Sequence, residues 1–150
     1  MRFRLMLPLL VVGSGILFAQ SAPIKMGLWE KTMVTTGHAG PVTLKAKSCI
    51  TPATWEEMLS NASKQHQGCT ITNSKTAHGY TFSGSCTMPH GSMVLKGSST
   101  ISDSEHIVSE SHSTTTINGN VRESESHSTS HFVSASCGTV KPGEPEIEDK

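Results

Sequence analysis

Residues 105–135 read EHIVSESHSTTTINGNVRESESHSTSHFVSA, and this stretch decides the fold. Asn118-Gly119-Asn120 lies near its centre and is the strongest β-hairpin signal in the chain, because Asn and Gly accept the positive φ angles that tight hairpin turns require. Long runs rich in Ser, Thr, Val and His flank the turn on both sides. The stretch therefore predicts two antiparallel strands, at 105–117 and 121–135, joined by a tight turn.

The segments before this hairpin continue the pattern of strands and polar turns. Residues 42–47 alternate cleanly, with Val42, Leu44 and Ala46 on one face. Residues 88–91 (Met-Pro-His-Gly) suit a type I turn, with Pro at the second position and Gly at the fourth. Further strands are predicted at 27–36, 42–47, 69–76, 80–88 and 92–101. The predicted fold class is mainly β, an antiparallel meander of about seven strands that forms a curved sheet or a partly closed barrel.

One short helix is predicted near residues 52–62. Thr51 suits the N-cap, and Pro52 suits the first helical position, where its missing N–H costs nothing. The apolar residues that follow recur at spacings of three and four and so share one helix face: Trp55, Met58, Leu59 and Ala62.

The N-terminus is typical of a cleavable export signal. Two arginines precede an apolar run at 5–18, which is shorter than the roughly twenty residues that a membrane-spanning helix needs. Small and polar residues follow, and both Ala19 and Ser21 suit the position before the cleavage site. We therefore predict a signal peptide at 1–21, no retained membrane anchor, and a periplasmic or extracellular location.

The charge of the chain argues against a nucleic-acid partner. The full sequence has 12 Lys and Arg against 12 Asp and Glu, and loss of the two leader arginines leaves a net charge of about −2 with neutral histidines. No run or cluster of Lys and Arg is present to neutralise phosphates.

The four cysteines are predicted to form two disulfides. An exported chain meets an oxidising compartment, and no pair has the C-x-x-C spacing of a zinc ribbon. A loop at 76–79 would set Cys69 directly opposite Cys86 on neighbouring strands, at a separation that a disulfide spans. That register pairs Cys69 with Cys86 and leaves Cys49 for Cys137. The second bond closes a loop of nearly ninety residues and should stabilise the fold by about 4 kcal/mol.

Residues 22–137 are expected to fold as a single β-rich domain. Its hydrophobic core must be thin, because much of its second half is Ser, Thr, His and Glu. The large aromatic residues are therefore predicted to lie in the core rather than to line a ligand site: Trp29, Trp55, Tyr80 and Phe82. Residues 138–150 contain two prolines and four acidic residues with little to bury, which predicts a disordered tail.

The hairpin at 105–135 carries four of the eight histidines. Whichever residues form its two-residue turn, even positions of the first strand share a face with odd positions of the second. One face is thus rich in His and Glu. The other is rich in Ser and should point inward, either packed against the helix or as a shallow polar groove: Ile107, Ser109, Ser111, Ser113, Ile117, Ser124, Ser126, Ser128, Ser130 and Phe132.

The His and Glu face is a candidate metal site. An Asn118-Gly119 turn sets His106 opposite His131, whereas a Gly119-Asn120 turn sets His112 opposite His127. Imidazole and carboxylate ligands suit Zn²⁺ or Cu²⁺. The candidate ligands are His106, His112, His127, His131, Glu110 and Glu125. The alternative is a solvated polar face, which is ordinary for an antiparallel sheet.

Short features spread over nearly the whole chain after the leader form a recognisable layout: Gly27-Leu28-Trp29-Glu30, Cys49-Ile50-Thr51-Pro52, Gly68-Cys69, Cys86 and Cys137. In this layout the chain resembles a family of bacterial exported proteins catalogued as a domain of unknown function, DUF3617. It departs from the family in its late strands, which are rich in Ser and His rather than Met and Thr, and in the thirteen residues after Cys137. The resemblance implies a periplasmic or secreted location and no assigned activity.

No enzyme motif is present. The chain lacks a G-x-S-x-G elbow, an H-E-x-x-H pair, a phosphate-cradling glycine loop and a dinucleotide fingerprint. We therefore expect a non-catalytic protein without a resident cofactor that binds or interacts in the cell envelope, with other envelope proteins as candidate partners. The alternatives are a metal-binding protein that uses the histidine face for Zn or Cu, and a lipocalin-like carrier of a small apolar ligand.

Overall fold

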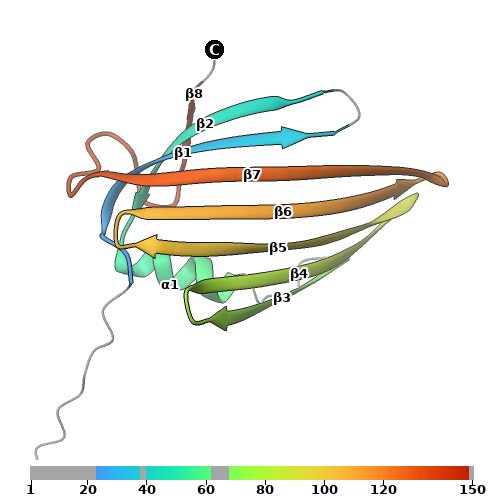
Figure 1. Ribbon diagram of the computed structural model, residues 1–150, viewed down its shortest axis with the longest axis horizontal. Coiled ribbons are helices and arrows are strands. Elements are labelled where there is room, and N and C mark those ends of the chain that lie inside the picture. Colours follow the sequence, from blue (N-terminus) through green and yellow to red (C-terminus); the bar gives the residue numbers. More distant parts are fainter. Residues whose placement is uncertain (1–22, 38–39, 62–67, 149–150) are drawn as a thin grey trace, which may run out of the picture.

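Strands make up most of the chain, as the alternation of side chains predicts. The computed structural model describes residues 23–37, 40–61 and 68–148, so the predicted signal peptide at 1–21 and Ala62 lie outside the described residues. The elements are β1 (Gly27–Thr36), β2 (Val42–Ile50), α1 (Pro52–Asn61), β3 (Cys69–Thr76), β4 (Gly79–Met88), β5 (Gly91–Asp103), β6 (His106–Ile117), β7 (Asn120–Ser134) and β8 (Glu146–Glu148) (Figure 1). The mainly β fold class is confirmed, with one more strand than predicted.

These strands form one antiparallel sheet in the order β3-β4-β5-β6-β7-β1-β2-β8. Strands β3 to β7 are a meander, and the β1–β2 hairpin adds to its far side because β1 pairs with β7. The sheet is curved and does not close: β3 and β8 are its two edges.

The hairpin at the centre of the sequence argument has the Asn118-Gly119 turn. Asn118 has a φ of 50° and Gly119 a φ of 79°, so both central residues take the left-handed conformation of a type I′ turn. Ile117 pairs with Asn120, and the register runs from there to His106 opposite His131. Of the two predicted registers, the first is therefore the one that forms.

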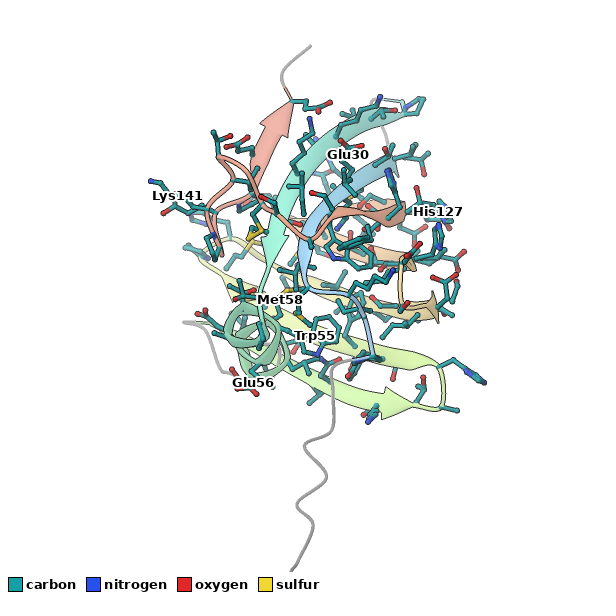
Figure 2. The ribbon with its side chains drawn as sticks, turned by 90° about the vertical axis from the view of Figure 1, so that its left-hand side faces the viewer. Glu30, Trp55, Glu56, Met58, His127 and Lys141 are labelled. Carbon is teal, nitrogen blue, oxygen red and sulfur yellow. A yellow bond between two sulfur atoms is a disulfide. The ribbon has the colours of Figure 1, made fainter. Side chains whose placement is uncertain are left out.

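Helix α1 begins where the sequence predicts. The Thr51 hydroxyl accepts a hydrogen bond from the Thr54 backbone N–H at 3.2 Å, and the Thr54 hydroxyl accepts one from the Thr51 N–H at 2.8 Å, so the two residues cap the helix reciprocally. Because α1 joins β2 to β3, it crosses from one side of the curved sheet to the other. Figure 2 shows the helix end-on against the hollow of the sheet. No helix among the described residues is long and apolar enough to span a membrane.

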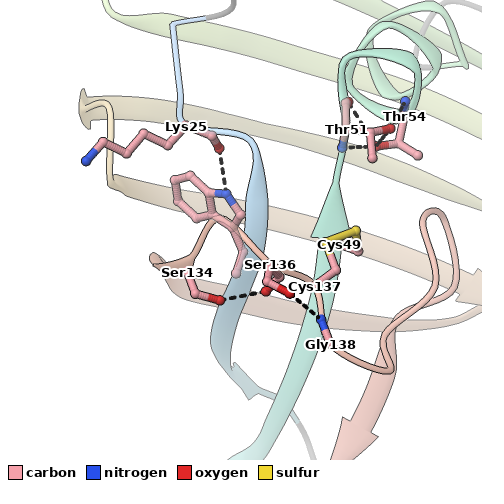
Figure 3. The surroundings of a disulfide bond; sticks show 9 residues. Lys25, Cys49, Thr51, Thr54, Ser134, Ser136, Cys137 and Gly138 are labelled. Atoms are coloured by element: carbon pink, nitrogen blue, oxygen red, sulfur yellow. Dashed lines mark hydrogen bonds between the residues drawn. A yellow bond between two sulfur atoms is a disulfide. The ribbon is translucent and has the colours of Figure 1, made fainter.

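A small hydrophobic core lies at this end of the sheet, beneath the helix. It consists of Ile24, Trp29, Ile50 and Trp55, with Trp29 only 1% exposed. The Trp29 indole N–H donates to the Lys25 carbonyl at 2.9 Å (Figure 3), which satisfies the polar atom of the most buried side chain. Of the four aromatic residues predicted to lie in the core, Trp29 and Trp55 belong to it and Tyr80 packs against it, whereas Phe82 lies outside this cluster.

Both predicted disulfides are present. Cys69 lies directly opposite Cys86 in the β3–β4 register, and Cys49 at the end of β2 bonds to Cys137, which follows β7 (Figure 3). The described residues contain no free cysteine.

The prediction of a disordered tail is wrong for residues 138–148. Val140 is only 5% exposed, Pro142 forms a bridge with Cys49, and β8 pairs with β2. The physical reason is the tether: the disulfide at Cys137 holds the following residues beside β2, where an unpaired edge offers backbone hydrogen-bonding groups.

Candidate functional site

Helix α1 covers one face of the sheet, which is the inner face. A cavity of about 410 Å³ lies on this face. Helix α1 contributes Trp55, Met58 and Leu59 to its walls, and the sheet contributes apolar side chains from β1 to β6. A volume of this size is within the range of small-molecule binding sites, roughly 300 to 1,000 Å³, and such sites are mostly apolar with a few polar groups.

The cavity exists because small residues occupy the middle of the inner face. Ser99, Ser109 and Ser130 line it where a typical sheet would carry large apolar side chains. Helix α1 lies at one end of the long strands (Figure 1), and among the described elements no other helix covers the inner face. The sequence left open whether the serine face is packed or grooved, and the structure shows a groove.

Aromatic side chains form the rigid parts of the walls. Trp29 packs edge-on against Phe132 with ring centroids 6.1 Å apart, and Trp55 packs edge-on against Tyr80 at 6.2 Å. Phe82 lies over the backbone of Gly97, where a Cβ atom would come within 2.4 Å of the phenyl ring. These contacts fix the shape of the apolar surface before any ligand arrives.

Two polar residues stand out in this apolar lining. Among the described residues that line the cavity, Lys31 of β1 is the one charged residue, and Asn73 reaches the cavity from the edge strand β3. The Asn73 Oδ1 atom is buried and has no hydrogen-bond partner within the described part of the chain. An orphaned buried acceptor is costly, so a donor from a ligand or a water molecule would be favourable there.

The cavity continues along the inner face into a second, polar hollow of about 230 Å³. Five serines line this part, together with Lys31, Met33 and Phe82, and Glu110 contributes from β6: Ser99, Ser109, Ser111, Ser126 and Ser128. The serine hydroxyls partly satisfy each other across strands, as in the 2.8 Å bond between Ser99 and Ser109. Lys31 lines both parts, so it stands at the junction of an apolar chamber and a polar one.

The predicted His and Glu face is the opposite, outer face of the sheet. It borders an open depression of about 800 Å³, and four of the predicted ligands line it: Glu110, His112, Glu125 and His127. The other two, His106 and His131, lie opposite each other farther along the same strands. All six therefore share the predicted face.

Four of these six residues, His106, Glu110, His127 and His131, form separate ion pairs rather than a ligand set. His127 faces Glu110 at 3.6 Å, and His106 faces Asp103 at 2.9 Å. No group of three or more His, Cys, Asp or Glu side chains in the described residues is arranged to hold a metal ion. The candidate ligands lie on the predicted face of the sheet. They are distributed along several strands in pairs, however, and the structure gives the metal hypothesis no further support.

Contacts at the β5–β6 turn lower the pKa of Asp103. The Asp103 carboxylate accepts a hydrogen bond from the Glu105 backbone N–H at 2.7 Å and contacts His106 Nδ1. The Glu105 N–H first, and then the imidazole, hold the pKa of Asp103 below its ordinary value of 3.8.

A second electrostatic network joins four strands on the outer face. Lys47 of β2 lies 3.0 Å from Glu148 of β8 and 3.6 Å from Glu30 of β1, and Glu30 also faces His131 of β7 at 3.5 Å. The Glu148 carboxylate first, and then Glu30, raise the pKa of Lys47 above 10.5. This network ties β8 to the sheet, which is a structural role.

Two comparisons with known proteins, against curated sequences and against solved structures, found no match. The comparison with protein families did. Residues 24–137 match the family described as "Protein of unknown function (DUF3617)". The chain belongs to this family. The matched DUF3617 region runs from the start of the core, at Ile24, to the last cysteine, so it includes every residue that lines the inner cavity.

Lys31 and Asn73 were not predicted as site residues from the sequence. A signal for Lys31 was present, because the alternation of β1 sets it on the same face as Trp29 and Met33, where a charged residue is unexpected. Asn73 gave no such signal, because its position matters only once the curvature of the sheet brings β3 and β1 to the same cavity.

Proposed function

We propose that this DUF3617 protein is exported and acts as a non-catalytic binding protein, with the inner cavity as its ligand site. The observation that carries the proposal is the apolar chamber of about 410 Å³ beneath α1, whose walls are aromatic and aliphatic and whose polar groups are few. A domain with so small a core would gain stability by filling this space with larger side chains, yet serines occupy it.

Export is supported by the leader and by the disulfides. The segment at 1–21 has the charge, length and small-residue pattern of a signal peptide. Two disulfides, with Cys49 only 4% exposed, suit an oxidising compartment such as the periplasm or the cell exterior.

The test of export is the N-terminus of the protein that accumulates in a bacterial host. We expect the protein in the periplasmic or extracellular fraction, beginning at Gln20 or Ala22, which mass spectrometry of the intact chain identifies. A protein retained in the cytoplasm with its original N-terminus would contradict export.

The test of binding uses a neutral fluorescent apolar probe, N-phenyl-1-naphthylamine, and two neighbouring positions of β7. Ser130 lines the cavity, whereas Thr129 is exposed on the outer face. Ser130→Phe should fill the chamber and abolish saturable binding, and Thr129→Phe adds the same ring on the other face and should leave binding intact. Equal binding by the two variants, or no saturable binding by the wild type, would overturn the proposed site.

A further inference from the structure

Lys31 is the feature of the cavity that a purely apolar ligand leaves unexplained. Its neighbours on the same face of β1 are Trp29, which is buried, and Met33, which is half-buried. Lys31 itself is exposed and makes no hydrogen bond or ion pair with any residue that the structure describes. An ammonium group carries three donors, so this lysine brings a positive charge and unused hydrogen-bonding capacity to the site.

The charge distribution around Lys31 is one-sided. No acidic residue is among the described residues that line the apolar chamber. In the described lining of the polar hollow the one acidic residue is Glu110, whose side chain is 72% exposed and pairs with His127 on the outer face. On the inner face, the described lining therefore offers a positive charge with no protein counter-charge.

The two parts of the cavity on the inner face also differ in polarity. The chamber beneath α1 is apolar, the hollow beyond it is lined with serine hydroxyls, and Lys31 stands where the two meet. A ligand that fits both parts has an apolar body and an anionic head. One lysine balances one negative charge, and a volume of about 410 Å³ suits a single slender body rather than two bulky chains.

We propose that the cavity takes a fatty-acid-like molecule, a single alkyl chain with one carboxylate. The chain lies against the aromatic and aliphatic walls beneath α1, and the carboxylate accepts hydrogen bonds from the Lys31 ammonium. This inference rests on the binding function proposed above and adds the chemical class of the ligand.

The probes are three molecules with the same twelve-carbon chain and different heads: dodecanoate, dodecan-1-ol and dodecyltrimethylammonium, each below its micelle concentration. Binding is followed by the intrinsic fluorescence of Trp29 and Trp55, which both line the cavity, and by calorimetry. Protein purified from the periplasm and stripped of bound lipid should bind dodecanoate most tightly. Decanoate, shorter by two methylenes, should bind about fifteenfold more weakly if the chain is buried.

The variants separate the head from the chain. Lys31→Gln should weaken dodecanoate binding about tenfold and change dodecanol binding less than twofold. Lys31→Glu should reverse the preference, so that dodecyltrimethylammonium binds more tightly than dodecanoate. The matched control is Lys45→Gln, an exposed lysine of the neighbouring strand on the outer face, and it should change neither affinity.

Two different failures are distinguishable. If dodecanol binds as tightly as dodecanoate, or if Lys31→Gln behaves like Lys45→Gln, the fatty-acid assignment is wrong while the apolar binding site stands. If none of the three compounds saturates the wild-type protein, the proposed binding function fails together with its ligand class.

Discussion

Loss of the Cys49–Cys137 disulfide should destabilise the fold more than loss of Cys69–Cys86. The first bond joins residues 88 apart in sequence and the second joins residues 17 apart. In the chain-entropy model the two loops correspond to about 4.6 and about 3.1 kcal/mol at 25 °C. Domains are stable by only about 5 to 15 kcal/mol in total, so the longer loop accounts for a large share of the stability of this one. The Cys49–Cys137 bond also holds residues 138–148 against β2, which adds to its effect.

The measurement is urea unfolding of the double variants Cys49→Ala/Cys137→Ala and Cys69→Ala/Cys86→Ala, followed by tryptophan fluorescence. The first variant should lose about 1.5 kcal/mol more unfolding free energy than the second, as the difference between the two loop terms requires. Each variant is the control for the other, because each removes one disulfide and leaves the other in place. If the short-loop variant is the less stable of the two, the loop-length reasoning is refuted.

Three further predictions concern single side chains. Trp29→Ala removes the most buried side chain and should cost about 3 to 5 kcal/mol of unfolding free energy, and a loss below 1 kcal/mol in urea would show that the core lies elsewhere. Asn73→Leu removes a buried oxygen without a partner, so thermal unfolding of the ligand-free protein should show a gain of about 1 kcal/mol, and a loss would mean that Oδ1 is satisfied. The depressed pKa of Asp103 makes its contribution to stability fully present above the unfolded value of 3.8 and lost as pH falls through the lower folded pKa. A carboxyl-carbon NMR titration should therefore give Asp103 a midpoint below 3.8, and His106→Gln should move that midpoint upward; no movement would exclude the imidazole as a cause.

Local sequence signals were sufficient for most of the sheet. The Asn118-Gly119 turn and the spacing of Cys69 and Cys86 each define a two-strand register, because a hairpin fixes which residues lie opposite each other. Because Cys69 lies opposite Cys86 in this register, Cys49 is left to pair with Cys137. These features are short in range and require no knowledge of the curvature of the sheet.

The long-range features could not be derived in this way. The pairing of β1 with β7 joins residues about a hundred positions apart, and no turn between them specifies the contact. The tail was predicted as disordered from composition alone, since nothing in residues 138–148 indicates that Cys137 would anchor them beside an open edge. The cavity depends on the β1–β7 pairing, because side chains of β1 and β7 line it together with side chains of β3 to β6.

The two faces of the β6–β7 hairpin explain why the inner face, not the histidine face, is the better place for a ligand. On the outer face, several of the predicted ligands already lie beside an oppositely charged group of the protein, as His127 does beside Glu110 and His131 beside Glu30. On the inner face Lys31 has no partner and Asn73 Oδ1 has none, within the residues described. Unfilled apolar volume costs stability in the free protein, and an alkyl chain that fills it would recover part of that cost. In the proposed complex the carboxylate accepts hydrogen bonds from the Lys31 ammonium, whereas Asn73 Oδ1, itself an acceptor, still requires a donor such as water.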